Sequence, residues 1–523
     1  MSRGRRAALV AAFAVAMFAA FPQPVAGRVI DLGRIFAYVA PALLLLALRG
    51  LAPRAAAAVG FTATWVAHSA VLHWIYVVTV VYGHAPVAVG LLAPVGLAVY
   101  PALFGAGFGA LFAVLAARGL ASPWAVAALW TAMDHTRAFA LTGFPWATLG
   151  YAQHENAALL PLAAFTGVYG LSFVSALGGA ALAAAAEGRR VAAALAFAGV
   201  ALAHGLGLAA RHAPPEGASV RVAVLQGNID QGVKWSAAWR DRTLATYADL
   251  TRQAASRGAK LIVWPESAVP GPLVEEPELR RAVSELARET ASWLVVGGVG
   301  LAFDGGPRPS RYFDSAFVVD RDGVIRDRYD KTHLVPFGEY VPLRGLLGFF
   351  LRSVASGIAP LDVAPGARPR SLRVAPEGGD GFPVGVAVCY ELLFPDLMRR
   401  FAADGAELLL GITNDAWYGR TGAPYQFLAI TALRSAETGL WLGRAANTGV
   451  SAFIDGQGFV HQQTPIFEPA LLVADVPRHP SPRDATFYVR HGDWFAAACW
   501  AFVGVLVATA WRRRGAPVRG ALR

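Results

Sequence analysis

Three short segments of this sequence end an apolar run abruptly in a side chain that could do covalent chemistry. Leu261-Ile-Val-Trp-Pro-Glu266 ends in a carboxylate, Tyr329-Asp-Lys331 in an ammonium group, and Val384-Gly-Val-Ala-Val-Cys389 in a thiol. In open α/β sheets, reactive groups gather beyond the carboxyl ends of the strands. The sequence therefore predicts that Glu266, Lys331 and Cys389 come together beyond the carboxyl ends of the strands of one domain.

Such a set of side chains is suited to acyl transfer through a covalent intermediate. A thiol is a weak nucleophile until it loses its proton, and Glu266 can accept that proton if burial raises its pKa toward neutrality. Lys331 favours the thiolate and can stabilise a tetrahedral oxyanion, with the backbone N–H of Tyr390 as a second donor. Taken singly, Cys389 could be a small buried hydrophobe, Glu266 part of a strand-ending turn and Lys331 a solvated cation. Their joint occurrence at strand ends of one domain favours catalysis.

The sequence around these residues alternates between strand and helix patterns, which indicates a layered α/β domain. A hairpin is predicted around Asp322-Gly323. The other predicted strands are Val220–Leu225, Leu261–Val263, Trp293–Val296, Val384–Val388 and Leu408–Ile412, and the predicted helices are Trp235–Ser256, Pro277–Thr290 and Tyr425–Thr438.

The composition requires a second, non-aqueous module. Of the 523 residues, 55% are hydrophobic and only 15% are charged, whereas soluble domains carry about a quarter charged residues. A membrane-spanning helix needs about 20 apolar residues. The first two candidate spans are short, and the first could also be a signal-peptide core. The predicted spans are Ala7–Phe21, Ile35–Leu48, Ala55–Val81, Val87–Ala117, Ser122–Leu141, Ala158–Ala186, Val191–Ala210 and Trp494–Trp511.

The arginines indicate topology rather than nucleic-acid binding, because their runs adjoin apolar stretches although the net charge is +11. With a cytoplasmic N-terminus, the short outer loops hold only Arg28 and Arg34, and the other loop arginines lie inside, as the positive-inside rule requires. We therefore expect seven spans in residues 1–210, an extracytoplasmic catalytic domain at 211–493, and a C-terminal transmembrane helix with a cytoplasmic Arg-rich tail at 494–523. The two cysteines exclude a disulfide framework, and no metal-type Cys/His spacing is present.

These motifs resemble the nitrilase, or carbon–nitrogen hydrolase, superfamily, whose signature is a Glu–Lys–Cys triad in this chain order. The resemblance is closer still to the bacterial apolipoprotein N-acyltransferases, and it covers nearly the whole chain. It implies a membrane α-helical bundle of about eight transmembrane helices plus an α/β nitrilase-like αββα sandwich. The stretches that carry it are Gly143-Phe-Pro-Trp146, Gly150-Tyr151, Gln226-Gly-Asn228, Lys234-Trp235, Trp264-Pro-Glu266, Lys331-Thr-His-Leu-Val-Pro-Phe-Gly-Glu339-Tyr-Val-Pro342, Cys389-Tyr-Glu391, Thr413-Asn-Asp-Ala-Trp417 and Arg444-Ala-Ala-Asn447-Thr-Gly449-Val-Ser451.

The resemblance implies a two-step reaction. Cys389 would take a fatty acyl chain from a phospholipid, typically phosphatidylethanolamine, as a thioester. The acyl group would then pass to the amino group of the diacylglyceryl-cysteine that begins an apolipoprotein. The implied location is the bacterial inner membrane, with the catalytic domain on the periplasmic side. We expect a monomer that uses no cofactor, no metal and no nucleic acid.

The resemblance also implies supporting residues around the triad. Glu339 is implied to be essential and to orient Lys331 or Cys389, with a turn-capping carboxylate as the alternative. Tyr390 and Glu391 flank the nucleophile and are expected to shape its pocket. Three aromatic residues are expected to bind substrate unless they pack as core, namely Trp235, Trp417 and Phe350.

Two further features bear on lipid access. Leu343–Val363, an apolar segment broken by Arg344 and Arg352, is expected to dip into the outer leaflet as an anchor or lid, with a packed core helix as the alternative.

The fifth predicted span contains three ionisable residues, Asp134, His135 and Arg137. Because ionisable residues are costly inside a membrane, they suggest a functional role by default. Asp134 and Arg137 are, however, spaced for an i,i+3 ion pair, and we favour that structural interpretation.

Two other functions fit parts of the sequence. A membrane-tethered amidase would use the same triad with water as the acceptor, but seven spans exceed what a tether needs. A non-catalytic membrane scaffold or lipid-binding receptor would have no use for an intact Glu266, Lys331 and Cys389 set.

Overall fold

The computed structural model describes residues 1–212, 218–232, 237–340, 363–479 and 485–513. The chain forms two compact units. One comprises Met1–Tyr76, Ala88–Arg211 and His491–Arg523, and the other comprises Val77–Val87 and His212–Arg490. We call them the membrane unit and the catalytic unit, for the reasons that follow.

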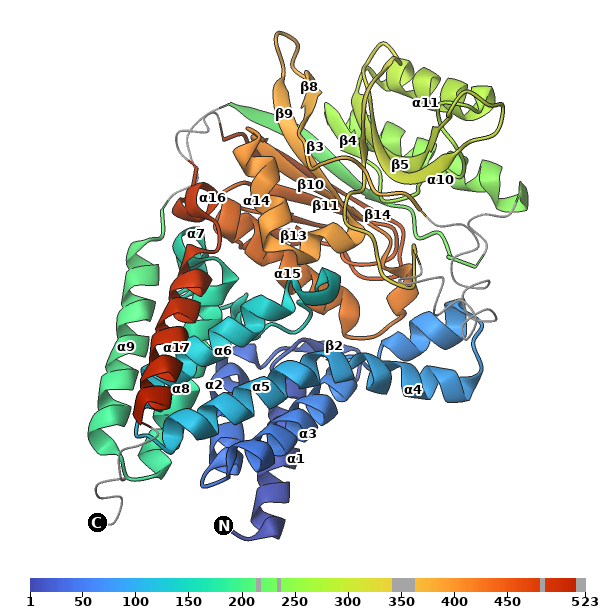
Figure 1. Ribbon diagram of the computed structural model, residues 1–523. Helices are drawn as coiled ribbons and strands as arrows, with labels where there is room; N and C mark the ends of the chain where they lie inside the picture. Colours follow the sequence, from blue (N-terminus) through green and yellow to red (C-terminus); the bar gives the residue numbers. More distant parts are fainter. Residues whose placement is uncertain (213–217, 233–236, 341–362, 480–484, 514–523) are drawn as a thin grey trace. The chain divides into compact units, whose positions relative to one another are not determined.

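The membrane unit is helical, because it is a succession of apolar runs separated by helix-starting and helix-ending residues. Ser122 begins one helix by accepting a hydrogen bond from the N–H of Ala125 at 3.2 Å, and Pro123 occupies the first turn. Figure 1 follows its α-helices, which are α1 (Arg3–Ala19), α2 (Gly33–Leu48), α3 (Pro53–Val71), α4 (Val87–Leu97), α5 (Val99–Ala116), α6 (Pro123–Arg137), α7 (Ala163–Thr166), α8 (Val168–Ala186), α9 (Arg190–Ala209) and α17 (Trp494–Arg512). Shorter elements are the hairpin strands β1 (Gln23–Val25) and β2 (Arg28–Ile30) and the 3₁₀ turns η2 (Ala140–Thr142), η3 (Leu149–Gln153) and η4 (Leu160–Leu162).

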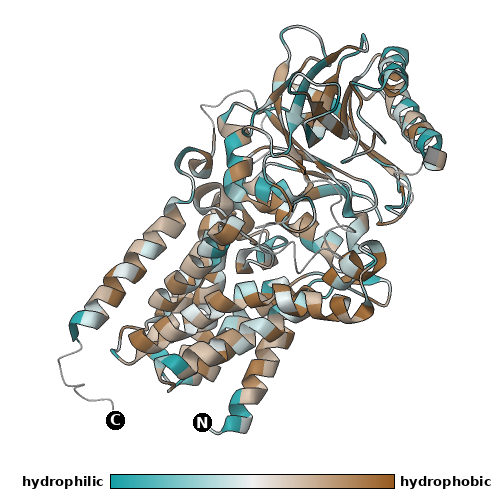
Figure 2. Cartoon of the chain, turned by 45° about the vertical axis from the view of Figure 1, so that its right-hand side comes forward, coloured by the Kyte–Doolittle hydropathy of each residue, from teal (hydrophilic) through white to brown (hydrophobic). Residues whose placement is uncertain are grey.

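Within the described ranges, four helical stretches are long and apolar enough to cross a membrane: α4 with α5, α8, α9 and α17. In Figure 2 the helices of this unit are brown over most of their length. Large apolar side chains point outward from them, since Leu92 is 67% exposed, Leu202 63% and Val505 63%. Such exposure is unfavourable in water and suits contact with lipid. The chain is a membrane protein with several candidate spans.

Two of the predicted spans have the wrong bounds. Within Ala55–Val81, α3 ends at Val71, and Val77–Tyr82 forms a π-helix, η1, that belongs to the catalytic unit. Within Ala158–Ala186, the long helix begins only at Val168, because Gly167 adopts a left-handed φ of +63° that separates α7 from α8. Apolar content cannot distinguish a span from a short irregular segment of the same hydropathy.

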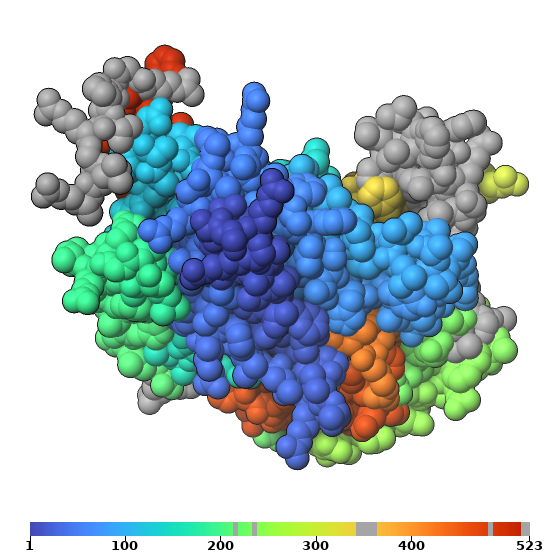
Figure 3. All heavy atoms as spheres, turned by 90° about the horizontal axis from the view of Figure 1, so that it is seen from below, coloured from blue at the N-terminus to red at the C-terminus, as the bar shows by residue number. Residues whose placement is uncertain are grey.

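Glycines allow α3 and α5 to pack backbone against backbone. A Cβ atom added at Gly60 would lie 2.3 Å from the carbonyl oxygen of Gly105, and one at Gly109 would lie 2.3 Å from that of Ala56. Close approach through small residues is how helices associate where lipid removes the hydrophobic driving force. Figure 3 shows the first helices, in blue, as adjoining surfaces.

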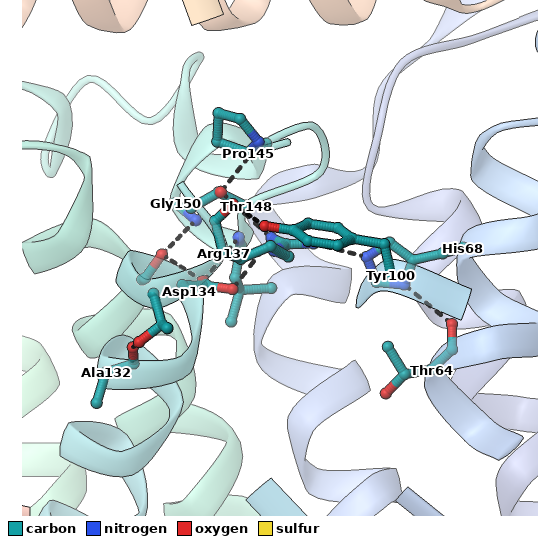
Figure 4. A network of polar contacts seen from close by, with 12 residues as sticks. Thr64, His68, Tyr100, Ala132, Asp134, Arg137, Pro145, Thr148 and Gly150 are labelled. Atoms are coloured by element: carbon teal, nitrogen blue, oxygen red, sulfur yellow. Dashed lines mark hydrogen bonds and ion pairs between the residues drawn. The ribbon is translucent and has the colours of Figure 1, made fainter. Parts of the chain in front are cut away.

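Arg137, at the end of α6, lies at the centre of a buried polar network (Figure 4). Its guanidinium donates to Asp134 Oδ1 at 3.2 Å and to His68 Nε2 at 2.9 Å. The other oxygen of Asp134 accepts hydrogen bonds from the N–H of Leu149 at 3.2 Å and the hydroxyl of Ser172 at 2.9 Å. The predicted i,i+3 pair is therefore confirmed, and it joins α6 to α3, to α8 and to η3.

The two histidines near this network are also held by specific partners. His68 Nδ1 lies 3.0 Å from the carbonyl oxygen of Thr64, so Nδ1 carries the proton and Nε2 accepts the hydrogen bond from Arg137. His135, the third ionisable residue of this helix, pairs with Asp493 at 3.4 Å, just before α17 begins. These contacts give the intramembrane charges structural partners.

Among the described residues, the catalytic unit contains two six-stranded sheets. The first has the order β14-β3-β4-β5-β6-β7 and the second β13-β12-β11-β10-β9-β8. In each, the central strands run parallel: β3, β4 and β5 in the first and β9, β10 and β11 in the second. The strands are β3 (Ser219–Gln226), β4 (Leu261–Val263), β5 (Trp293–Ala302), β6 (Arg311–Val319), β7 (Ile325–Asp330), β8 (Leu372–Val374), β9 (Phe382–Val388), β10 (Leu408–Thr413), β11 (Leu442–Ala446), β12 (Ala452–Ile454), β13 (Val460–Gln463) and β14 (Ala470–Pro477).

Helices cover the outer faces of these sheets, which gives the predicted αββα sandwich. The helices α10 (Ala237–Ser256) and α11 (Pro277–Thr290) lie over the first sheet, and α14 (Pro395–Ala403) and α15 (Ala423–Thr438) over the second (Figure 1). The sheets meet face to face where β3 contacts β11. A buried apolar core fills the space between α10, α11 and the first sheet. The short helix α16 (Phe487–His491) ends the unit.

The sequence-predicted elements of this unit are present. The predicted strands coincide with β3, β4, β5, β9 and β10, and the hairpin around Asp322-Gly323 is formed by β6 and β7. The predicted helices coincide with α10, α11 and α15. Each strand was marked by an apolar run, and every residue of β4 and β10 is indeed buried.

Candidate active site

Cys389 lies where β9 ends and the 3₁₀ turn η5 (Cys389–Leu393) begins. Its φ of +49° is in the left-handed region, which residues other than glycine rarely adopt. Such strain persists only where the surrounding structure enforces it, and it often marks a functional residue. The side chain is 8% exposed, and it is a free thiol.

Lys331 follows β7 directly and is completely buried. Its backbone N–H donates to the carbonyl oxygen of Asp314 in β6 at 2.9 Å, which continues the hairpin pairing by one residue. Its ammonium group forms ion pairs with Glu339, with Asp314 at 3.6 Å and with Glu266 at 3.8 Å. Burial alone would lower the pKa of Lys331, but these carboxylates raise it well above its usual value. Lys331 is therefore a fixed positive charge.

Glu266 follows β4 by three residues and is 8% exposed. Gly297 in β5 lies directly beside it, since a Cβ atom there would be 2.7 Å from the Cα of Glu266. The preceding Trp264 is anchored because its indole N–H donates to the hydroxyl of Thr251 at 3.0 Å. A glycine neighbour and a fixed tryptophan thus hold the carboxylate at the carboxyl end of the sheet.

The electrostatics of Cys389 reflect both predicted partners. Burial raises the pKa of its thiol well above the usual value, and the negative charge of Glu266 raises it further, while Lys331 opposes the shift. The resting side chain is therefore a thiol, and a base must remove its proton during attack. The structure thus places Glu266, Lys331 and Cys389 within mutual electrostatic reach, at strand ends of two different sheets.

Glu339, the predicted supporting carboxylate, contacts Lys331 directly. One of its oxygens accepts from the lysine ammonium, and the other accepts from the N–H of Val335 at 2.9 Å. Burial raises the pKa of Glu339, and Lys331 opposes that shift. Oxygen atoms of Glu266, Asp314 and Glu339 lie within 4.8 Å of one another, a spacing that could hold a metal ion. The Lys331 ammonium pairs with each of them, so it already supplies the positive charge that this group of oxygens requires.

Glu391 ties the nucleophile turn to the segment that carries the lysine. One oxygen accepts hydrogen bonds from the hydroxyl of Tyr329 at 2.6 Å and the N–H of Thr332 at 2.7 Å. The other accepts from the N–H of Val388, next to the nucleophile, at 2.8 Å. Glu391 therefore does not face the reacting atoms. It positions the backbone on both sides of them.

Tyr390, the residue after the nucleophile, is 6% exposed. Its ring lies 5.2 Å from that of Phe394 and 5.7 Å from that of His333, measured between ring centroids. His333 and Phe394 also contact each other at 3.8 Å. These ring contacts hold Tyr390, the residue directly after Cys389, in a fixed position.

Two family models match the chain and between them account for both units. The model of the apolipoprotein N-acyltransferase N-terminal domain matches residues 9–181, and that of the carbon-nitrogen hydrolases matches residues 221–480. The apolipoprotein N-acyltransferase of Geobacter metallireducens is 40% identical over 91% of this chain and 91% of its own length. That of Vibrio vulnificus is 32% identical over 92% of this chain and 93% of its own length. The chain belongs to the apolipoprotein N-acyltransferase family. Among solved structures, an amidase from Nesterenkonia sp. AN1 is similar over 55% of this chain and 100% of its own, with 21% identity and a TM-score of 0.39.

The remaining predicted substrate contacts of this N-acyltransferase family member divide into two groups. Trp417 is half-buried in η6 (Asp415–Tyr418), the turn that follows β10. Trp235 and Phe350 lie outside the described residues, as does nearly all of the predicted lid, Leu343–Val363.

Sequence reasoning missed two kinds of residue in this N-acyltransferase site. Asp314 pairs with Lys331 from within β6, and its only sequence signal is an acid inside a mostly apolar strand. Asp415, the first residue of η6, and Arg444 in β11 form a completely buried ion pair at 2.8 Å. Both of these residues stand in motifs that carried the family resemblance.

Proposed function

We propose that the chain transfers an acyl group from a phospholipid to the terminal amino group of an apolipoprotein through a thioester on Cys389. The observation that carries the proposal is the strained, buried Cys389 beside the Lys331 ion cluster, in a chain of the apolipoprotein N-acyltransferase family. A thioester suits this reaction because an amine attacks it readily. The lipid donor and lipoprotein acceptor follow from the family.

In the first half-reaction, the sulfur of Cys389 attacks the ester carbonyl of the phospholipid while Glu266 accepts the thiol proton. The carbonyl becomes a tetrahedral oxyanion, which the ammonium of Lys331 and the N–H of Tyr390 stabilise. The carbon–oxygen bond to glycerol then breaks. The departing oxygen takes the proton from Glu266, so a lysophospholipid leaves and a thioester remains.

In the second half-reaction, the neutral α-amino group of diacylglyceryl-cysteine attacks the thioester. Glu266 accepts a proton from the attacking amine as the carbon–nitrogen bond forms. Collapse of the second oxyanion breaks the carbon–sulfur bond, and the sulfur recovers the proton from Glu266. The products are an amide on the lipoprotein and the resting thiol, so every proton is accounted for.

The buried charges support these roles. Lys331 cannot give up its proton, because nearby carboxylates raise its pKa, so it acts as an electrostatic stabiliser rather than a general acid. Asp314 in β6 and Glu339 in the segment after β7 both form ion pairs with its ammonium group and hold it in place.

Phosphatidylethanolamine is our proposed donor, and a monomer is our proposed functional form.

The test is a two-stage mass measurement on the purified full-length chain. Incubation with phosphatidylethanolamine should add one acyl mass to the protein, and a diacylglyceryl-cysteine peptide should then discharge it. Cys389→Ala should carry no adduct, whereas the matched thiol variant Cys499→Ala should carry the same adduct as the unmodified chain. Absence of any adduct would overturn the proposal.

The amidase alternative gives a different result in the same experiment. If water discharges the thioester as fast as the peptide does, the chain is a hydrolase. If Cys389→Ala does not change the rate of acyl transfer or of hydrolysis, the site is not catalytic. The chain is then a non-catalytic membrane scaffold or lipid-binding receptor. Each outcome selects one of the functions that the sequence allows.

We further propose eight spans and a periplasmic catalytic domain, with the domain bounds given by the sequence. The eight would be α1, α2, α3, α4 with α5, α6, α8, α9 and α17. The arginine distribution supports this orientation. Arg308 lies exposed between β5 and β6, so Arg308→Cys in a Cys499→Ala background should react with a membrane-impermeant maleimide on intact spheroplasts. Reaction only after lysis would contradict the orientation.

A further inference from the structure

The segment Val77–Val87, which we call the strap, belongs to the catalytic unit although it connects two helices of the membrane unit. Its first half is the π-helix η1 (Val77–Tyr82), closed by a hydrogen bond from the N–H of Gly83 to the carbonyl oxygen of Val78 at 2.9 Å. π-Helices are rare and occur frequently at functional sites. The N-terminal half of the chain thus supplies one segment, the strap, to the unit that contains Cys389.

The strap packs on the turn η6. The ring of Tyr82 meets that of Trp417 edge-on, with centroids 5.8 Å apart and an interplanar angle of 73°. Behind the turn, Gly419 has a left-handed φ of +61°, and a Cβ atom there would lie 2.9 Å from a methyl group of Val77. The glycine therefore permits close approach of the strap to the backbone of the turn.

The same turn reaches the nucleophile. Strand β10, which leads into η6, pairs in parallel with β9, and Ile412 lies opposite Val388, the residue before Cys389. Burial raises the pKa of Tyr418 well above its usual value, and the charges of Cys389, Asp415 and Glu266 add to the shift. Tyr418, at the end of η6, is thus within electrostatic reach of the catalytic groups. The turn thus contacts the strap and lies within electrostatic reach of the thiol.

The chemistry of the strap suits an acyl chain rather than a charged headgroup. Its sequence, Val-Val-Thr-Val-Val-Tyr-Gly-His-Ala-Pro-Val, contains no Asp, Glu, Lys or Arg. The side chains of η1 are only half-buried, and that of Val81 is 52% exposed. Apolar surface of this kind gains free energy when a hydrocarbon chain covers it.

We propose that the strap is a specificity-determining part of the acyl-transfer site, in which Tyr82 positions the η6 turn through Trp417 and the apolar side chains receive the acyl chain bound to Cys389. This inference rests on the acyl-transfer function proposed above. Tyr82 is a positioning residue here, since it acts through Trp417 rather than on the reacting atoms.

The test compares donors of different chain length in a Cys499→Ala background, where Cys389 is the only thiol. Tyr82→Ala should lower kcat/KM for thioester formation from a palmitoyl donor by about tenfold and from a decanoyl donor by much less, because the longer chain covers more apolar surface. Tyr82→Phe keeps the ring and should stay near the parent. Leu91→Ala, which removes an exposed apolar side chain from α4, is the matched control and should change neither donor.

A double-mutant cycle tests the route through Trp417. If Tyr82 acts through that ring, adding Tyr82→Ala to Trp417→Ala should cause no further change. The double variant and Trp417→Ala alone should then have the same kcat/KM for each donor and the same preference between the two donors. A purely structural role would lower the rates of both donors equally and lower the thermal midpoint. Equal loss for both donors, or no loss for either, would overturn the inference.

A separate readout distinguishes failure of this inference from failure of the proposed function. Alkylation of Cys389 by N-ethylmaleimide and by a long-chain N-alkylmaleimide requires no acyl transfer. The parent should favour the long-chain reagent, and Tyr82→Ala should lose that preference. If the parent forms no thioester but shows this preference, the acyl-transfer function is wrong and the apolar role of the strap stands. If the parent forms a thioester but shows no preference, the acyl-transfer function stands and the inference about the strap is wrong.

Discussion

Each unit of the chain buries a cluster of charges, and the two clusters are balanced differently. Among the described residues of the membrane unit, Arg137 pairs with one carboxylate, Asp134, whose oxygens also accept from Leu149 and Ser172. In the described part of the catalytic unit, Lys331 faces three carboxylates. A balanced cluster fixes geometry. An excess of one sign shifts pKa values, which is what a reactive site needs. Burial alone therefore does not distinguish a structural charge cluster from a reactive one. The balance of positive and negative groups in the cluster does.

The largest expected effect is the loss of catalysis on Glu266→Gln. The buried thiol of Cys389 has a raised pKa, so attack depends on a base, and removing a general base costs about 10²–10⁴-fold in rate. Because the amide is isosteric, the thermal midpoint should stay close to that of the parent. Single-turnover thioester formation and thermal unfolding measure the two effects.

Glu278→Gln is the matched control for that experiment. Glu278 is an exposed carboxylate in the first turn of α11 of the same unit. Neither the rate nor the midpoint should change. If Glu266→Gln kept more than a tenth of the parental rate, Glu266 would not be the base.

Asp134→Asn should show the opposite pattern. Removing one partner of a buried ion pair leaves an uncompensated charge and costs about 3–5 kcal/mol in stability. The thermal midpoint in detergent should fall clearly, whereas the rate per folded molecule should change little. Glu155→Gln, at a carboxylate that is 53% exposed in the same unit, should leave the midpoint unchanged. A variant that keeps its midpoint but loses activity would assign Asp134 a catalytic role.

Much of the catalytic unit could be predicted from the sequence, because its strands are short apolar runs that stop at polar residues. Glu266, Lys331 and Cys389 each follow such a run. Because β4 and β7 belong to the first sheet and β9 to the second, the packing of the two sheets, rather than the strand register of one, brings the three residues together. Asp314 could not be found in this way. It lies within a strand rather than at its end, and its approach to Lys331 depends on the register in which β6 pairs with β7, which the predicted hairpin around Asp322-Gly323 does not specify.

The strap shows the same limit for the predicted membrane spans. Val77–Val87 is as apolar as the helices on either side of it, so hydropathy assigned its first half to a span. Its first half is a π-helix that packs on η6 through Tyr82 and Trp417, and this packing is a tertiary effect. Hydropathy reports that a segment avoids water, but it does not report whether lipid or protein covers it.

Glu391→Gln should affect both stability and rate, because this carboxylate is buried like Asp134 but lies beside the nucleophile. Its oxygens accept backbone hydrogen bonds from Thr332 and Val388. The amide nitrogen of glutamine cannot accept, so one of these donors would be left unsatisfied, at about 1–3 kcal/mol. Thermal unfolding should report that loss. The rate of thioester formation should fall less than in Glu266→Gln. A rate loss equal to that of Glu266→Gln would mean that Glu391 takes part in the chemistry.

The smallest expected effect is on the pH dependence of stability, and it also separates the two clusters. The folded state raises the pKa values of Cys389 and Lys331 above their usual 9.0 and 10.5. At pH values above about 9, the unfolded chain therefore releases protons that the folded chain retains, and stability falls as the pH rises. The slope for one such group is at most about 1.4 kcal/mol per pH unit.

In a Cys499→Ala background, Cys389→Ala should make the fall in stability between pH 9 and 10 shallower, as measured by the thermal midpoint. Asp134→Asn should lower the midpoint at every pH and leave the slope unchanged, because it leaves the thiol of Cys389 and the ammonium of Lys331 in place. Equal slopes with and without the Cys389 thiol would show that the site does not hold its proton.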